Sequence, residues 1–90
     1  MPQAIVDPED LHRFAVDLKR FSAEVQVQIA SIHRQFGKLG ETWKDQEHAK
    51  FAGDFQHMIT VVTKFVSSAE EQVPILLRKA EAIRRYLERR

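Results

Sequence analysis

The sequence predicts an all-α protein, built as an antiparallel two-helix hairpin that dimerises into a four-helix bundle. Three observations support this prediction. The 90 residues make a single domain over residues 1–90, which is too short to bury a large core unaided. Apolar residues recur at helical spacing through two long segments, and a short segment with two glycines separates them. The sequence contains no cysteine, so its stability must come from packing.

The first helix is predicted over about residues 8–36. Asp7 followed by Pro8 and an acidic turn is typical of an N-cap and a first helical residue. Gly37 and Gly40 are expected to end the helix, because glycine readily adopts the left-handed conformation that closes many helices. Between these signals one apolar column repeats every seven residues: Leu11, Leu18, Val25, Ile32 and Leu39.

A turn over about residues 37–42 should lead into a second helix over about residues 43–88. Thr42 and Asp45 have the spacing of a capping box, in which the two side chains satisfy each other's backbone N–H groups. This spacing places Trp43 at the first helical position, where its indole can cover the ends of both helices. The candidate turn and recognition motif therefore consists of Gly40, Thr42, Trp43 and Asp45.

The second helix carries an unusually wide apolar face, made of three neighbouring columns at seven-residue spacing. One partner helix cannot cover three columns, so we expect a homodimer or a heterodimer with a similar hairpin protein. The expected dimer interface consists of Phe55, Met58, Val62, Phe65 and Val66.

Pro74 is expected to kink or break the second helix, because an interior proline removes a backbone hydrogen bond at a cost of roughly 3 kcal/mol. From the helix lengths, the second helix is expected to extend past the end of the first helix from about Pro74 onward. The apolar stripe beyond the proline would then be uncovered. Its last residues, Tyr86 and Leu87, are the candidate C-terminal recognition element.

Composition and motifs favour an interaction protein over an enzyme. The net charge is only +1, and acids at the start and bases at the end suit the dipoles of two helices. A nucleic-acid or anionic-membrane patch is the alternative interpretation of the basic end, but no aromatic ladder supports it. The imidazoles are interpreted as solvated helix positions: His12, His33, His48 and His57.

Catalytic and cofactor sites are not expected. The single pair Asp54 and His57 falls short of the two such pairs that a di-metal helical bundle needs. Ser67 and Ser68 have no histidine at helical spacing, and the glycines fit no phosphate-binding loop. We therefore expect no enzymatic activity, no metal and no cofactor.

The first 30 residues contain no unbroken apolar run, because charged residues interrupt it throughout. This pattern predicts neither a cleavable signal peptide nor a membrane-spanning segment. The protein is expected in the cytoplasm, with any export following a route that needs no cleaved leader.

The chain resembles the ESAT-like family of type VII secretion, whose small helical hairpins carry a Trp-x-Gly turn. The similarity covers the two patterned helices, the central "LGETW" turn and the following "WKDQEHAKF". Asp45 stands where the family motif has glycine. Arg90 follows four residues after Tyr86, where the family's export signal has an acidic residue.

The resemblance implies a dimeric secretion substrate, or the partner of one, that is secreted and acts through protein–protein interaction. It also implies an export determinant at the Trp43 turn, and a secretion ATPase as a candidate partner. The alternative is a cytosolic helical adaptor that offers its apolar stripe to a larger protein and is not secreted. Neither hypothesis includes nucleic-acid binding or stable membrane insertion.

Overall fold

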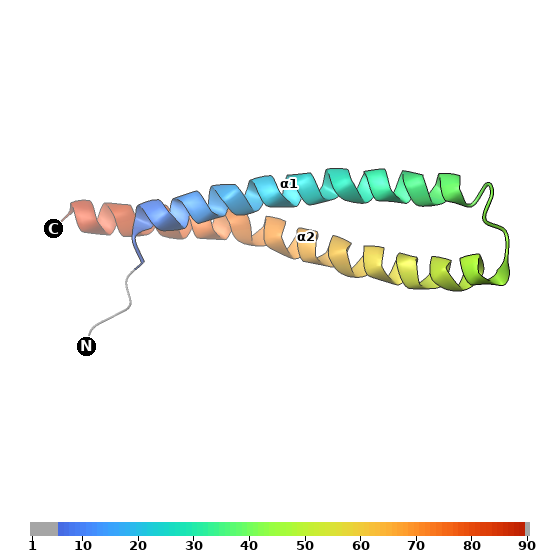
Figure 1. The fold of residues 1–90 in the computed structure, drawn as a ribbon. Coiled ribbons are helices and arrows are strands. Elements are labelled where there is room, and N and C mark those ends of the chain that lie inside the picture. The colour runs from blue at the N-terminus through green and yellow to red at the C-terminus, as the bar shows by residue number, and fades with distance from the viewer. Residues whose placement is uncertain (1–5, 90) are drawn as a thin grey trace.

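A computed structural model describes residues 6–89 as two long antiparallel α-helices joined by a short turn (Figure 1). Helix α1 spans Pro8–Leu39 and helix α2 spans Gln46–Glu88. Together they form a rod of 68 × 24 × 15 Å. The start of α1 and the end of α2 lie at the same end of this rod. The all-α hairpin predicted from the sequence is confirmed.

The start of α1 follows from local chemistry. Asp7 is the N-cap, and its carboxylate accepts a hydrogen bond of 2.9 Å from the backbone N–H of Glu9. Pro8 is the first helical residue, where its missing N–H costs nothing. Glu9 and Asp10 then place negative charge on the positive end of the helix dipole.

The end of α1 differs from the sequence-based expectation. The helix continues through Gly37 to Leu39, and Gly40 caps it in the right-handed region, at φ −66° and ψ −13°. The expected left-handed closure is therefore wrong. Helix-like bonds continue into the turn instead, because the N–H groups of Thr42 and Trp43 both donate to the carbonyl of Leu39, at 3.2 and 3.0 Å.

The start of α2 also differs. The helix begins at Gln46, and Asp45 is itself the N-cap, accepting a bond of 3.2 Å from the backbone N–H of His48. The Thr42 hydroxyl donates backwards to the carbonyl of Leu39, at 3.4 Å. The expected capping box between Thr42 and Asp45 is therefore absent. Aspartate is at least as good an N-cap as threonine, so the helix starts three residues later than expected.

Helix α2 is continuous through Pro74, so the break considered from the sequence does not occur. The proline lies on the exposed side of the helix, while Val73 beside it and Ala69 one turn earlier are buried. Packing against α1 on both sides of the proline keeps the helix intact. A backbone hydrogen bond is lost at one exposed position only.

The two helices remain packed against each other well beyond Pro74, contrary to the sequence-based expectation. Ala80 is only 1% exposed. Glu9, in the first turn of α1, contacts Arg84 of α2. Because α2 starts only at Gln46, the part of α2 that packs against α1 extends to higher residue numbers than expected from the sequence. Residues 75–84 therefore belong to the packed hairpin.

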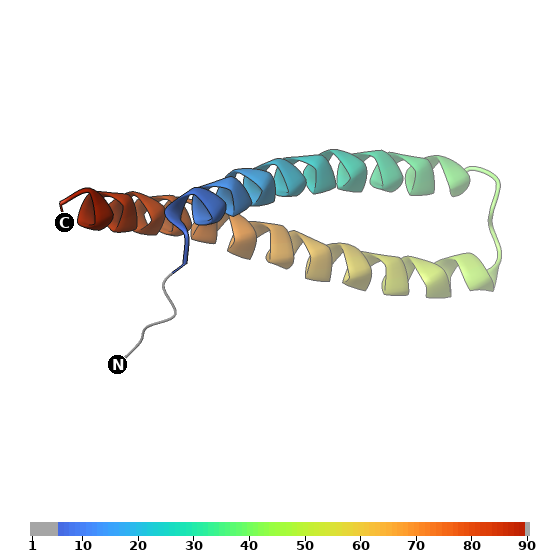
Figure 2. The ribbon, with the colours of Figure 1, turned by 60° about the vertical axis from the view of Figure 1, so that its left-hand side comes forward.

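The spacing between the helices varies along the rod. Figures 1 and 2 show the two ribbons lying close together toward the chain ends and further apart toward the turn. The closely packed part buries the small residues Ala15, Ser22, Ala69 and Ala80, whereas the part near the turn packs phenylalanines. Small side chains allow two helix axes to approach, so residue size accounts for the divergence.

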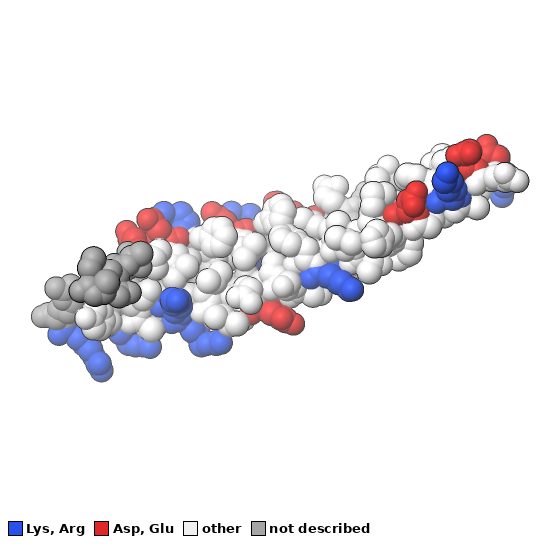
Figure 3. All heavy atoms as spheres, turned by 90° about the horizontal axis from the view of Figure 1, so that it is seen from below, with Lys and Arg blue, Asp and Glu red and all other residues white. Residues whose placement is uncertain are grey.

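Neither helix within residues 6–89 combines the length and the apolarity that crossing a lipid bilayer requires. On the side of the rod drawn in Figure 3, charged side chains gather toward the ends and the edges, and the middle is mainly uncharged. On this side, the rod thus has a charge-poor middle section.

Candidate interaction surfaces

The turn end of the rod is filled by an aromatic cluster, here called the turn cluster, comprising Phe36, Trp43, His48, Phe51 and Phe55. Phe36 of α1 packs against Phe55 of α2, with ring centroids 4.7 Å apart. Phe51 lies 5.7 Å from Phe36 and 6.1 Å from Phe55. These contacts tie the two helices together next to the turn.

The half-buried Trp43 covers this cluster from the turn itself, outside either helix. Its ring meets His48 edge-on, with centroids 5.1 Å apart and planes at 81°, and lies 6.1 Å from Phe51. Its indole N–H donates to Oδ1 of Asp45 at 2.9 Å. The indole therefore packs over the start of α2, although the residue precedes this helix rather than starting it.

His48 lies inside the turn cluster, although sequence reasoning treated it as a solvated helix position. Its ring stacks on Phe36, with centroids 5.1 Å apart and planes at 3°. Its Nε2 atom is buried and has no hydrogen-bond partner within residues 6–89. The signal for this placement was available, because His48 continues toward the turn the seven-residue column that contains the buried Phe55 and Ala69.

A side chain at Gly40 is disfavoured by space rather than by backbone conformation. A Cβ atom at this position would lie 3.3 Å from Nε2 of His48. Of the four residues expected in the turn motif, Gly40, Trp43 and Asp45 therefore meet around His48. Thr42 is exposed and only bonds back to α1.

A second feature is an apolar groove between the helices, with a volume of about 650 Å³. Most of the expected dimer residues lie on or beside it, but not all of them face outward. Phe55 is only 9% exposed and Val66 only 2% exposed, so both serve mainly the packing of the hairpin. The groove is lined by Phe21, Glu24, Val25, Gln28, Ile29, Ile32, Phe55, Met58, Ile59 and Val62.

Exposed apolar side chains from both helices surround this groove. Met58 and Phe65 of α2 are about half exposed, and Phe65 packs edge-on against Phe21 of α1 at 6.3 Å. Ile32 and Leu39 extend the same exposed set toward the turn. Sequence reasoning assigned the interface to α2 alone, whereas the structure presents residues of both helices on one face.

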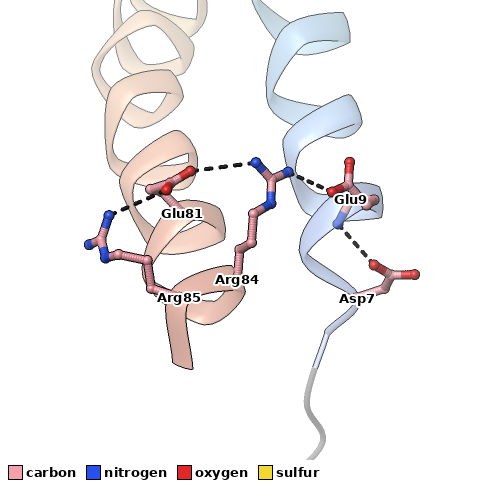
Figure 4. Close-up of polar contacts among 5 residues, drawn as sticks. All are labelled: Asp7, Glu9, Glu81, Arg84 and Arg85. Atoms are coloured by element: carbon pink, nitrogen blue, oxygen red, sulfur yellow. Dashed lines mark hydrogen bonds and ion pairs between the residues drawn. The ribbon is translucent and has the colours of Figure 1, made fainter. Parts of the chain in front are cut away.

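The third feature is the charged end of the rod, where an ionic network joins the helices (Figure 4). Nη2 of Arg84 lies 2.6 Å from Oε2 of Glu9, and Nη1 lies 3.6 Å from Glu81. Arg85 also contacts Glu81, at 3.4 Å. Beyond this network, the candidate recognition residues Tyr86 and Leu87 are exposed near the end of α2.

These features define a class: an elongated helical hairpin with an aromatic turn and an exposed apolar face. No protein-family model matches the chain, and no curated protein matches it. Among solved structures, a single-site mutant of the secreted protein EsxB from Bacillus anthracis strain Sterne is 27% identical, with a TM-score of 0.79. The match covers 94% of this chain and 96% of that one.

A selenomethionine-labelled EsxB from the same organism also aligns, with 27% identity and a TM-score of 0.76. That match covers 96% of this chain and 98% of EsxB. Length and fold therefore agree with EsxB over nearly the whole chain, and the resemblance to the ESAT-like small helical-hairpin proteins is confirmed.

Proposed function

We propose that the protein is a substrate of a type VII secretion system, or the partner of one, and acts through protein–protein contact without catalysis. The observation that carries this proposal is the exposed apolar groove on a hairpin whose full length matches EsxB. EsxB is described as a secreted protein. The same export is proposed for this chain.

Dimerisation is the first part of the proposal. Exposed apolar side chains on both helices favour burial against a second hairpin, which completes a four-helix bundle. The proposed contact surface keeps Met58, Val62 and Phe65 from the original expectation and adds Phe21 and Ile32 of α1. The partner is a second copy or a similar hairpin.

Recognition by the export machinery is the second part. The turn, with Trp43 half-buried over the cluster, and the exposed tail residues Tyr86 and Leu87 lie at opposite ends of the rod. Trp43, Tyr86 and Leu87 do not line the groove, so a dimer formed through the groove leaves them available. A secretion ATPase is the proposed partner for these ends.

Two measurements test this function. Light scattering on the purified protein, alone and mixed with a hairpin encoded beside it, should report twice the mass of one chain in one of the two samples. Culture supernatants of the native host should contain the protein, and deleting the secretion ATPase gene should remove it. A stable monomer in both samples would contradict the bundle. Retention in the cell regardless of the ATPase would favour the cytosolic adaptor.

A further inference from the structure

One carboxylate oxygen joins the tryptophan to the start of α2. Oδ1 of Asp45 accepts the indole N–H of Trp43 at 2.9 Å and the backbone N–H of His48 at 3.2 Å. The first bond comes from a turn side chain and the second from the first turn of a helix. The indole is therefore tied to the helix N-terminus through a single atom.

The backbone of Trp43 lies outside both helices, so helical geometry does not fix the orientation of its indole. Trp43 precedes α2 by three positions, and its own backbone bond goes back to Leu39 of α1. The aromatic rings beside the indole are those of His48, at 5.1 Å, and Phe51, at 6.1 Å. Ring packing alone leaves rotation about the side-chain torsions open, whereas a hydrogen bond to a capping residue selects one orientation.

We propose that Asp45 is the positioning residue of the turn: it holds the indole of Trp43 in the orientation that a binding partner meets. This inference rests on the proposed function, since it assumes that the turn is recognised. The Trp-x-Gly motif has glycine at this place, which has no side chain. The hydrogen bond between the indole and a carboxylate is therefore a feature of this chain rather than of the motif. The indole has a single donor, which Asp45 already occupies, and its ring remains for recognition.

Three substitutions separate positioning from helix capping. Asp45→Asn keeps an acceptor oxygen at the same reach, so it should preserve both bonds. Asp45→Ser keeps a good N-cap, but its shorter side chain does not reach the indole. Asp45→Gly removes the side-chain acceptor altogether. All three should remain helical by circular dichroism.

The first readout is the exchange rate of the indole N–H with solvent, measured by NMR on the full chain. We expect exchange about tenfold slower in the wild type and in Asp45→Asn than in Asp45→Ser, because only the first two retain the bond. Equal exchange in Asp45→Ser and the wild type would overturn the positioning role. This measurement needs no partner, so its outcome is independent of whether the protein is exported.

The second readout is the amount of each variant in the culture supernatant, with Trp43→Ala for comparison. Asp45→Ser should be exported several-fold less than the wild type, and Asp45→Asn should restore export. Absence of the wild type from the supernatant would refute the proposed export, whereas normal export of folded Trp43→Ala would refute only the recognition of the turn. Loss of export in Trp43→Ala together with normal export of Asp45→Ser would overturn the positioning role alone.

Discussion

At three positions a glycine occupies right-handed backbone that alanine also accepts, since no glycine has a positive φ. Gly37 and Gly53 lie inside helices, and a Cβ atom at either would meet nothing within 4 Å. Gly53 therefore marks no close helix approach. Gly40 differs, because its Cβ would crowd Nε2 of His48 at 3.3 Å.

We expect Gly37→Ala and Gly53→Ala each to raise the free energy of unfolding by about 0.5–1 kcal/mol, because alanine loses less backbone entropy on folding. Gly40→Ala should give no such gain, since the His48 ring must shift to admit the methyl group. Thermal denaturation of the three variants at one protein concentration checks this. An equal gain at all three positions would show that His48 has room to move.

At the scale of one element, Pro74 is a weak point within α2. It lies exposed, so replacing it sacrifices little packing, and alanine supplies the missing N–H for the carbonyl of Glu70. Pro74→Ala should therefore stabilise the protein by about 1–3 kcal/mol. Gln72→Ala, at another exposed position of the same helix, should change stability by less than about 0.5 kcal/mol. Urea denaturation measures both, and no gain from Pro74→Ala would indicate that the proline is needed for packing.

The last third of α2 should be essential to the hairpin. A chain ending at Val73 lacks the buried Ala80 and the contact between Arg84 and Glu9. We expect this chain to lose cooperative thermal unfolding, because the first turns of α1 have nothing to pack on. A chain ending at Arg85 keeps both contacts and should melt within a few degrees of the full protein. Similar melting of both truncated chains would place residues 75–84 outside the core.

At the scale of the whole molecule, we expect dimerisation to depend on the residues that line the groove, rather than on every exposed apolar residue. Met58 and Val61 are nearly equally exposed, at 48% and 52%, but only Met58 lines the groove. Met58→Glu buries a charge in the proposed dimer and should weaken it by about tenfold or more. Val61→Glu should leave it intact. Sedimentation equilibrium of both variants provides the comparison, and equal weakening would move the interface away from the groove.

Some features of this structure could be predicted from the sequence, and others could not. The two helices and the capped start of α1 follow from the sequence, because helical periodicity and an Asp-Pro start act within a few residues of chain. The packing of the indole beside the turn could also be anticipated, because a large apolar ring next to a turn tends to pack on the neighbouring helix end. The role of Asp45 in holding the indole could not, because it depends on which residue caps α2.

Only the tertiary structure decided which apolar columns face inward. Both helices offer neighbouring columns of similar hydrophobicity, and periodicity alone does not choose among them. The structure buries the small residues Ala15 and Ser22 at the helix contact and leaves Phe14 and Phe21 outside. Two helices approach most closely where side chains are small, so the rotation of each helix depends on its partner. For the same reason Val66 lies inside the hairpin and Phe65, one residue earlier, remains on the surface proposed for a second chain.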